Sequence, residues 1–339
     1  MYNLTVNASK RYQITISNGL QEFGAAVLPY ITGDKVAIVT DTNVHRLYGN
    51  ALDEFLRGKT VYKYVIEAGE QSKNKTEYFN LLEQLCANGF SRTDTVIAFG
   101  GGVVGDLAGF VAATYMRGVN LVQAPTTILS AVDSAVGGKT AINLTSGKNL
   151  VGCFYQPSAV YVNTEFFRTL PEREIKSGMG EVIKYAFLSD TVTPQMIKDG
   201  ATEQLVYECL KIKRDVVEKD ERENNLRLLL NLGHTVGHAI ESLSHYSYSH
   251  GECVVKGIAY TLKVSKALYN LNDQTLAKMQ RLLVCCGHDV TCPFSATQLI
   301  EQIALDKKGD GKSIKFVALK DIGKPQIEKL TYEKLQNLL

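Results

Sequence analysis

The alternation of short apolar runs with helical stretches in the first half of the chain restricts the fold more than any other feature. Residues 35–41 and 95–99 are rich in β-branched residues and predict buried strands, and the second run ends in glycines. Residues 76–88 have the spacing of an amphipathic helix, and 120–124 and 159–163 are further strand candidates. Strands that alternate with helices predict a parallel sheet with crossover helices.

The second half of the chain is predicted to be helical. Helical periodicity covers residues 172–188, 204–219, 226–243, 254–270 and 276–286, and residues 313–319 form a short strand or extended segment. We therefore expect an α/β N-terminal domain with a Rossmann-like parallel sheet over residues 1–165. An all-α C-terminal domain should follow over residues 166–339, with the active site in the cleft between the two.

The composition excludes several classes of partner. The 339 residues, 45% of them hydrophobic, are enough for two buried cores. Lysine and arginine number 37 against 35 acidic residues, a balance that indicates no nucleic-acid or membrane-surface partner. The first residues lack the pattern of a secretion signal, and no apolar run reaches transmembrane length, so we expect a cytoplasmic protein.

The seven cysteines are scattered along the chain and include no CxxC spacing. This pattern argues against a zinc ribbon or a redox pair. We interpret all seven as reduced thiols in the hydrophobic core.

A glycine loop follows the predicted strand 95–99. Residues 100–106 read GGGVVGD and contain the G-x-G-x-x-G spacing, in which backbone amides at a helix start approach a pyrophosphate. A tight turn is the alternative, because glycine tolerates positive φ. The acidic residue expected about 20 positions later for a ribose is missing, and Asp41, at an earlier strand end, is a substitute. Residues 69–73 and 124–127 end further strands, so several strand ends should meet at one crevice.

The run Gly137-Gly138-Lys139-Thr140 superficially suggests a P-loop. A Walker A motif needs a glycine five positions before Gly138, where this chain has Asp133, so we reject a P-loop NTPase. Lys139 and Lys148 still lie on glycine-flanked turns, which suits a phosphate or a carboxylate. Solvated surface lysines are the alternative.

Four polar residues recur at helical spacing in the second half. Arg227, Asn231, His234 and His238 are separated by four, three and four positions, which places them on one face of the predicted helix. The residues between them are apolar. We interpret the stripe as the lining of an internal cleft.

A metal site is expected near this stripe, because four of the six histidines lie between positions 234 and 250. Satisfied core histidines are the alternative. Glu181 is the best candidate for a carboxylate ligand, since it shares a helix face with Lys184, although a surface ion pair would look the same. Spacing alone does not select which two of His234, His238 and His250 join Glu181.

Several motifs together resemble one enzyme family. They are residues 100–106 (GGGVVGD), 115–118 (YMRG), 125–127 (PTT), 133–140 (DSAVGGKT), 147–149 (GKN), 181–185 (EVIKY) and 231–241 (NLGHTVGHAIE). In this order, over nearly the whole chain, they resemble 3-dehydroquinate synthase. That family is one of the sugar-phosphate cyclases, which are related to iron-dependent alcohol and glycerol dehydrogenases.

The resemblance implies a role for each matching residue. Zinc, with cobalt as an alternative, would be held by Glu181, His234 and His250, which leaves His238 for the substrate. The NAD contacts implied are Asp41, Asn43, Glu70, Lys73, Gly102, Val103, Val104, Gly105, Asp106, Thr126, Thr127, Lys139, Lys148, Phe166, Phe167, Arg168 and Thr169. The substrate contacts implied are Asp133, Lys139, Asn149, Lys184, Lys213, Arg227, Asn231 and His238, with Arg117 as a candidate from the second subunit of a homodimer.

The implied enzyme is a carbon–oxygen lyase of the shikimate pathway of aromatic amino acid biosynthesis. It converts 3-deoxy-D-arabino-heptulosonate 7-phosphate to 3-dehydroquinate and phosphate by transient oxidation with NAD, phosphate elimination, reduction and an intramolecular aldol closure. Three rivals remain: a cyclase for another sugar phosphate, a polyol dehydrogenase that releases NADH, and an inactive binding module.

This sequence departs from the family pattern at two positions. Gly180 replaces a more usual alanine, and Lys256 lies in a stretch that is usually apolar. One of Lys307 and Lys308 is also expected to contact the substrate.

Overall fold

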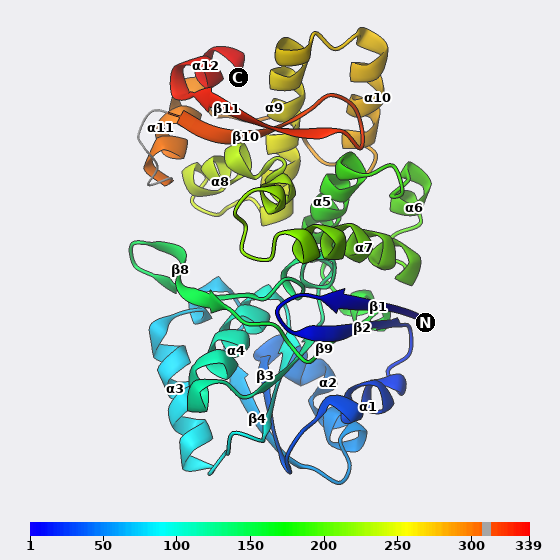
Figure 1. Cartoon of the computed structure of the whole chain (residues 1–339), viewed down its shortest axis with the longest axis vertical. Coiled ribbons are helices and arrows are strands. Elements are labelled where there is room, and N and C mark those ends of the chain that lie inside the picture. Colours follow the sequence, from blue (N-terminus) through cyan, green and yellow to red (C-terminus); the bar gives the residue numbers. More distant parts are fainter. Residues whose placement is uncertain (307–312) are drawn as a thin grey trace. The chain divides into compact units, whose positions relative to one another are not determined.

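The computed structural model describes residues 1–306 and 313–339 and divides the chain into two compact units, Met1–Leu170 and Pro171–Leu339 (Figure 1). Lys307 and Lys308, one of which was expected to contact the substrate, lie outside the described residues. Within them, no helix is both long and apolar enough to cross a membrane.

The first unit is built on a seven-stranded sheet with the order β1-β2-β9-β6-β5-β3-β4. Its strands are β1 (Tyr2–Asn7), β2 (Arg11–Ser17), β3 (Lys35–Asp41), β4 (Thr60–Ile66), β5 (Thr95–Gly100), β6 (Asn120–Pro125) and β9 (Ala159–Asn163). Only the edge pair β1–β2 is antiparallel, and every other neighbouring pair is parallel. The predicted parallel sheet is therefore confirmed. The strands β1 and β2 were not predicted, and β4 was predicted only as a strand that ends near residues 69–73.

Four helices and a hairpin complete the first unit. They are α1 (Glu22–Val27), α2 (Thr42–Phe55), α3 (Lys75–Ala87), α4 (Gly102–Thr114) and the antiparallel pair β7 (Lys139–Leu144) and β8 (Gly147–Phe154). One face of the sheet packs on α3 and α4 in a hydrophobic core that includes Ala98 and Leu107. On the opposite face, Phe23 packs edge to face on Phe99 and Tyr161. The alternation of side chains along each strand sends Ala98 and Phe99 to these two different cores.

The strand order reverses between β3 and β5. The chain passes from β3 outward to β4, whereas β5 lies on the other side of β3 and continues outward to β6 and β9. The register pairs Gly100 with Pro125, and Asp41 with Ile66, so the carboxyl ends of four neighbouring strands lie at one edge. Open α/β sheets bind ligands at such a reversal, and the glycine loop lies there.

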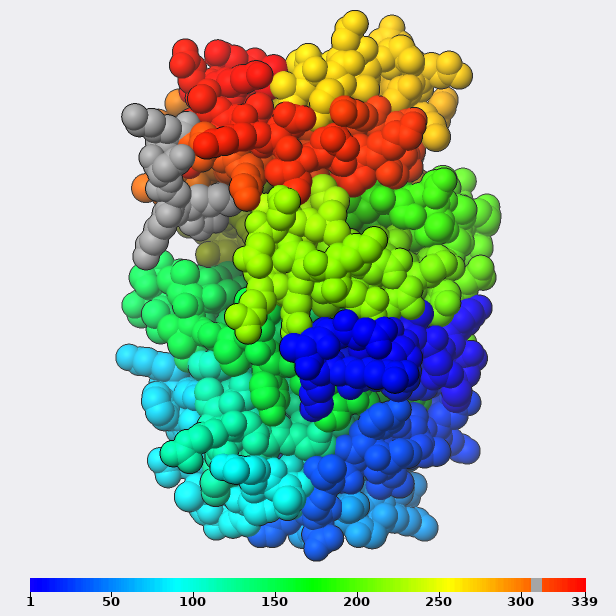
Figure 2. All heavy atoms as spheres, in the orientation of Figure 1, coloured from blue at the N-terminus to red at the C-terminus, as the bar shows by residue number. Residues whose placement is uncertain are grey.

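The second unit is mostly helical but also contains a β-hairpin. Its elements are α5 (Glu172–Leu188), α6 (Pro194–Lys198), α7 (Glu203–Lys219), α8 (His234–Leu243), α9 (His250–Tyr269), α10 (Asp273–Leu283), α11 (Ala296–Asp306), β10 (Ser313–Leu319), β11 (Pro325–Thr331) and α12 (Tyr332–Leu338). Because β10 and β11 form an antiparallel pair, the prediction of an all-α domain was wrong. The hairpin, red in Figure 2, packs on α9 in a shared core that includes Phe316 and Val264. The alternative of a strand at 313–319 is confirmed.

The predicted helix 226–243 is broken. A short 3-10 segment covers Leu226–Asn231, and α8 begins only at His234, after Gly233 in a left-handed conformation with φ of 78°. A side chain at Gly233 would meet the carbonyl oxygen of Val254 at 2.7 Å, so the backbone lies against α9 there. Close contact with α9 therefore requires the break, and Arg227 and His234 do not share one helix face as predicted.

The cysteines are all free, but only Cys209 and Cys253 are buried. Cys86 and Cys153 are exposed, and the remaining three are half-buried. The interpretation of all seven as core thiols was therefore wrong. Residue type alone does not reveal which side of an element is covered, and Cys285, Cys286 and Cys292 lie outside the helices and strands.

Candidate metal centre and nucleotide-binding edge

Three potential metal ligands from three helices meet in the second unit. Glu181 lies in the middle of α5, His234 begins α8, and His250 begins α9. The Nε2 atoms of His250 and His234 lie 3.1 Å and 3.3 Å from the same oxygen, Glu181 Oε1. One ligand atom from each residue lies within 4.8 Å of the others. One carboxylate with two imidazoles is a donor set that zinc commonly uses when a coordination position stays open for a substrate.

The other nitrogen of each imidazole has its own partner. His234 Nδ1 is 3.1 Å from the carbonyl oxygen of Leu232, and His250 Nδ1 is 3.3 Å from Glu241 Oε2. An Nδ1–H donated to such an oxygen fixes the tautomer and leaves the lone pair on Nε2 for a cation. Glu241 was not among the predicted site residues, although it is the last residue of the motif 231–241. Its position seven residues after His234 could have suggested the same helix face.

Neighbouring positive charge and hydrogen bonds keep Glu181 ionised despite its burial. Its side chain is completely buried, and Oε2 lies 2.5 Å from the buried ammonium of Lys184. Burial alone would raise the pKa of Glu181, but the charges of Lys184 and His234 and the imidazole hydrogen bonds hold it well below the usual value. Burial likewise disfavours the charged imidazole of His250, yet hydrogen bonds to Glu181 and Glu241 raise its pKa to about 10. The pocket therefore favours positive charge beside Glu181.

The donor set fits a divalent cation. Glu181 Oε2 pairs with the Lys184 ammonium, whereas Oε1 is the oxygen that both imidazole Nε2 atoms approach. Glu181, His234 and His250 would therefore hold a cation through Oε1 and the two Nε2 atoms.

Glycine contacts bring the helices together at this centre. A Cβ at Gly180 would lie 2.4 Å from the carbonyl oxygen of Gly251, and one at Gly251 would lie 1.9 Å from that of Ser177. The backbones of α5 and α9 therefore touch next to Glu181 and His250. The hydroxyl of Ser249 and the carboxylate of Glu252 form a capping box that begins α9 at His250. Position 180 therefore leaves no room for a side chain, because the two helices are in direct contact there.

His238 offers a second grouping. His238, Glu241 and His250 also bring one ligand atom each within 4.8 Å of the others, so His250 belongs to both sets. His238 is exposed, whereas Glu181 is completely buried. A carboxylate removed from water gains more from a nearby cation than an exposed imidazole does. This difference favours the set with Glu181, in agreement with the resemblance.

The cationic residues among the predicted substrate contacts of the second unit are strongly buried, whereas Asn231 is half-buried and His238 is exposed. Lys213 on α7 is 4% exposed, and Arg227 is 2% exposed. The Arg227 guanidinium donates to the carbonyl oxygen of Glu221, and the Asn231 amide donates to Glu223 Oε1 at 3.0 Å. Buried cations are costly unless anions or hydrogen bonds compensate them, so these groups are suited to an anionic ligand.

The buried ammonium of Lys256 is compensated by contacts of its own. Its side chain is 1% exposed, and the ammonium donates to Asp289 Oδ2 at 2.9 Å and to the carbonyl oxygen of Thr291 at 2.6 Å. The same group lies 4.9 Å from the ring centroid of Tyr248. Lysine is therefore tolerated in an otherwise apolar stretch because it anchors the segment 289–291.

In the first unit, α4 begins directly after β5 at the glycine loop. None of Gly100, Gly101, Gly102 and Gly105 has positive φ, so the turn alternative does not explain them. Side chains there would instead collide: a Cβ at Gly100 would lie 2.6 Å from Val104, and one at Gly105 would lie 3.0 Å from Gln123. No side chain caps the helix at Gly101, which leaves its first amides for an anion.

Hydroxyl and carboxylate groups from neighbouring strand ends lie at the same edge. Thr126 follows β6, and its buried Oγ1 finds no partner within residues 1–306 and 313–339. Thr127 Oγ1 is 2.8 Å from Ser130 Oγ. Asp41 ends β3, where its Oδ1 caps α2 by accepting from the amides of Asn43 and Val44. A buried hydroxyl without a partner beside uncapped amides is compatible with a dinucleotide.

A hydrogen-bonded cluster links the predicted cofactor and substrate residues of this unit. The Lys73 ammonium is 4% exposed and donates to the carboxylate of Asp106 and to Asn149 Oδ1, the latter at 2.5 Å. Asn143, which was not predicted, connects them by donating to Glu70 Oε1 at 2.7 Å and accepting from the Asn149 amide at 2.9 Å. Asn149 itself has positive φ of 57°. These residues come from four separate segments, so no local pattern revealed the cluster.

Several other predicted site residues of the first unit lie in separate elements. Lys139 and Lys148 lie on the hairpin β7–β8, and Asp133 lies in the short π-helix Ser130–Ser134. Phe166 and Phe167 are buried, and Phe166 packs on Phe99 with ring centroids 5.2 Å apart. Their rings therefore belong to the core, and only backbone atoms there are suited to a cofactor contact.

The end of the segment 166–169 is exposed, where Arg168 pairs with Glu165 at 2.9 Å. Thr169 Oγ1 lies 2.8 Å from the Tyr48 hydroxyl. These contacts tie the segment to its own unit. They leave the exposed guanidinium of Arg168 as the only long polar side chain among residues 166–169.

Arg117 is not brought near the glycine loop. It follows α4, whose 13 residues run about 20 Å away from Gly102 toward the amino ends of the strands. Arg117 and Met116 both have positive φ, at 64° and 49°, and Arg117 is exposed. A contact between Arg117 and the glycine loop of the same chain is therefore excluded by distance.

Solved structures with the same fold include sugar-phosphate cyclases and dehydrogenases. A 2-deoxy-scyllo-inosose synthase complexed with carbaglucose-6-phosphate, NAD+ and Co2+ has a TM-score of 0.87, with 24% identity over 99% of both chains. The 2-epi-5-epi-valiolone synthase of Streptomyces hygroscopicus, with NAD+ and Zn2+ bound, has a TM-score of 0.86, with 22% identity, over 99% of this chain and 98% of that one. A probable glycerol dehydrogenase of Sinorhizobium meliloti gives 0.62, with 17% identity, over 96% of this chain and 94% of that one. The fold thus defines the class that sugar-phosphate cyclases share with these dehydrogenases.

Sequence relatives place the chain within this class. The model of the 3-dehydroquinate synthase N-terminal region matches residues 63–177, and that of the C-terminal region matches residues 178–309. A 3-dehydroquinate synthase of Clostridium acetobutylicum is 39% identical, with 96% of both chains covered. That of Latilactobacillus sakei is 42% identical, over 97% of this chain and 96% of that one. The chain belongs to the 3-dehydroquinate synthase family and is an enzyme rather than an inactive binding module.

Proposed function

We propose that this chain converts 3-deoxy-D-arabino-heptulosonate 7-phosphate to 3-dehydroquinate and phosphate, a step of the shikimate pathway. The observation that carries the proposal is the convergence of two imidazole Nε2 atoms on one buried oxygen of Glu181. The relatives of known name, at 38–43% identity, support the same activity. We assign the enzyme to the phosphate-eliminating carbon–oxygen lyases that depend on NAD and a divalent metal.

Glu181, His234 and His250 would hold zinc, or cobalt in its place. When bound, the metal supplies a Lewis acid for a substrate hydroxyl, and NAD supplies a transient hydride acceptor. Lys184 keeps Glu181 ionised, while Leu232 and Glu241 hold the two imidazoles in the tautomer that exposes Nε2. These contacts orient the ligands before any cation arrives.

NAD would bind at the carboxyl edge of the parallel sheet. The uncapped first amides of α4 are suited to the pyrophosphate, and Thr126 offers a buried hydroxyl. The cofactor residues expected from the resemblance at this edge, from Asp41 to Lys148, retain that proposed role. Phe166 and Phe167 would contribute backbone atoms only.

The substrate would bind through cations and amides that already have hydrogen-bond or ionic partners within the chain. Lys213 and Arg227 can offset the charges of a phosphate and a carboxylate, and Asn231 and His238 can bind hydroxyls. Asp133, Lys139, Asn149 and Lys184 complete the proposed set. The phosphate of the substrate is itself held close to the proton that leaves during elimination, so the protein mainly positions it.

We further propose that the active site lies in a cleft between an NAD-binding unit and a metal- and substrate-binding unit, within a cytoplasmic homodimer. Arg117 supports the dimer, because it cannot reach the glycine loop of its own chain yet belongs to a motif of the family. A second copy could supply its exposed guanidinium to the neighbouring active site.

The decisive experiment incubates the purified protein with the heptulosonate phosphate, NAD and zinc. Phosphate and dehydroquinate should appear in equal amounts, without net NADH. A polyol dehydrogenase would instead accumulate NADH. Glucose 6-phosphate and sedoheptulose 7-phosphate, offered under the same conditions, test the other cyclases, and faster turnover of either would refute the proposed substrate.

A further inference from the structure

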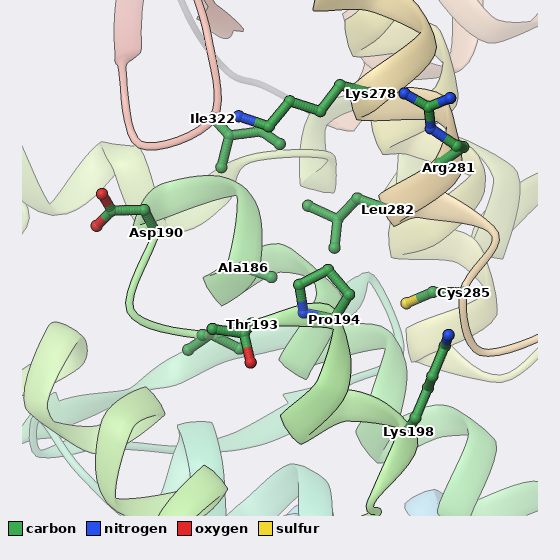
Figure 3. A pocket seen from close by; sticks show the side chains of 11 residues that line it. Ala186, Asp190, Thr193, Pro194, Lys198, Lys278, Arg281, Leu282, Cys285 and Ile322 are labelled. Carbon is green, nitrogen blue, oxygen red and sulfur yellow. The ribbon is translucent and has the colours of Figure 1, made fainter.

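A cavity in the second unit is formed by elements that the proposed reaction does not use. It has a volume of about 520 Å³, is open to solvent on one side, and is lined by the end of α5, by α6, by α10 and by the turn of the hairpin β10–β11 (Figure 3). Volumes between about 300 and 1,000 Å³ are usual for small-molecule sites. The turn is held in place because the Gly323 amide donates to the carbonyl oxygen of Phe187 at 2.9 Å.

The wall of this cavity is apolar. Ala186, Val192 and Leu282 are buried, and Pro194 and Ile322 extend the same surface. In Figure 3 the side chains of Ala186, Pro194, Leu282 and Ile322 surround one space. An apolar wall of this kind favours a ligand with a ring or a branched carbon skeleton, since burying apolar surface contributes about 25 cal/mol per Å².

The rim of the cavity is cationic. Lys198 from α6 and Lys278 and Arg281 from α10 lie there and are exposed, and none of the three forms an ion pair or hydrogen bond with any residue of 1–306 or 313–339. The single acidic residue, Asp190, directs its carboxylate away from the cavity in Figure 3, whereas Lys198 extends toward Cys285. Three cations without protein partners beside an apolar wall favour an anion.

We propose that this cavity binds a small organic anion, an apolar ring or branched chain with one carboxylate, which pairs mainly with Lys198. The inference does not depend on the proposed synthase reaction. Lys278 and Arg281 contribute attraction at longer range. The end of α5 that lines the cavity belongs to the same helix as Glu181, so an occupied cavity would touch the helix that carries a proposed metal ligand.

Binding is tested by titration calorimetry with 2-naphthoate, using protein saturated with NAD and zinc. We expect a dissociation constant on the order of 1 mM, as for a ligand of this size. The neutral analogue 2-naphthalenemethanol should bind more weakly. Lys198→Gln should raise the constant about threefold, and the double variant Lys198→Gln/Lys278→Gln about tenfold. Lys219→Gln, at an exposed lysine in the last turn of α7, is the matched control and should bind as the unmodified chain does.

Each remaining outcome overturns the proposal. Equal affinity for the alcohol, or unchanged affinity in the double variant, would show an apolar cavity without preference for anions. Loss of naphthoate binding in Arg227→Gln but not in Lys198→Gln would place the probe among the proposed substrate residues. If no binding heat appears at a 2-naphthoate concentration 10 times the expected dissociation constant, the cavity is not a site.

Cys285 provides an independent reporter at the cavity wall. A hydrogen bond with Cys286, and the nearby charge of Lys198, lower the pKa of its thiol despite partial burial. Iodoacetate and iodoacetamide differ in charge, so the ratio of their alkylation rates at Cys285, normalised to exposed Cys86, measures anion enrichment. Peptide mass spectrometry should give a ratio that falls about threefold in Lys198→Gln and in the presence of 2-naphthoate. A ratio equal to that of Cys86 would contradict the proposal.

Discussion

The metal centre of the second unit and the nucleotide-binding edge of the first differ in how they are built. The metal centre consists of side chains from three helices, and its key residues Glu181 and Lys184 are 0% and 1% exposed. The edge consists mainly of backbone amides at Gly101 and of small residues that end successive strands. The metal centre therefore depends on particular functional groups, whereas the nucleotide-binding edge depends on the absence of large side chains.

The largest expected effect follows from removing a ligand at the metal centre. Glu181→Ala or His234→Ala should abolish turnover and deplete zinc, with a loss larger than the roughly 100-fold that an outer-shell partner can cost. Measurement of bound zinc by elemental analysis, with turnover measured in parallel, checks this. Normal metal content in both purified variants would refute the ligand assignment.

Glu241 tests whether a residue that contacts a metal ligand, without being one of the three proposed ligands, affects zinc affinity. Glu241→Gln should lower zinc affinity by about 10- to 100-fold, because His250 loses the carboxylate that orients its ring. Competition with a chelator measures the affinity. NAD affinity should not change, and Glu218→Gln, at an exposed carboxylate on α7, is the control. A zinc affinity equal to that of the control would show that Glu241 has no positioning role.

A larger side chain at the glycine loop tests the nucleotide-binding edge, where space rather than a functional group is expected to matter. Gly101→Val should weaken NAD binding by about tenfold or more, since even a Cβ there would lie 3.2 Å from Thr127 and a larger side chain would cover the first amides of α4. Equilibrium binding of NAD measures the change, with zinc content as the internal control. Should zinc content fall while NAD affinity stays constant, the division of roles between the two units would be reversed.

The smallest expected effect concerns a second buried lysine, Lys256. The Lys256 ammonium donates a hydrogen bond to the carboxylate of Asp289, and so does Thr291. Together they lower the pKa of Asp289 to about 2 from the usual 3.8. A lowered folded-state pKa stabilises the fold above about 3.8, and this contribution is lost as the pH falls toward 2. Asp289→Asn should therefore reduce stability slightly at pH 5 and not at pH 2, and the effect stays small because the Asp289 side chain is 65% exposed.

Denaturant unfolding of both proteins at the two pH values measures this difference. The comparison with Lys184 is informative, because the carboxylate that pairs with Lys184 is completely buried. A stability difference that persists unchanged at pH 2 would mean that Asp289 acts through packing rather than charge.

Local patterns predicted those elements whose residues decide their own conformation. The strands β3, β9 and β10 and the helix α5 begin and end where the apolar periodicity indicated. The strand β11 was missed, because Pro325-Gln-Ile-Glu-Lys-Leu-Thr has little alternation and forms only by pairing with β10. Pairing partners distant in sequence are not visible in a local window.

The metal centre shows the same limit. Residue types indicated that Glu181 and some of the histidines could bind a metal, but spacing did not select which two of His234, His238 and His250 join Glu181. The break at Gly233 and the contact between Gly180 and Gly251 decided which nitrogen atoms face the carboxylate. Neither the break nor the glycine contact follows from the helical periodicity, which predicted a continuous helix through residue 233.

By itself, the sequence determined the α/β class of the first unit, the mainly helical character of the second, the position of the glycine loop and the chemical groups available for a metal, because these depend on residue type and short-range spacing. Only the tertiary structure decided that Nε2 of His234 and of His250 meet at Glu181 Oε1, and that Asn143 and Glu241 support their neighbours. Such choices depend on how closely backbones approach each other, and close approach is a property of residues far apart in the chain.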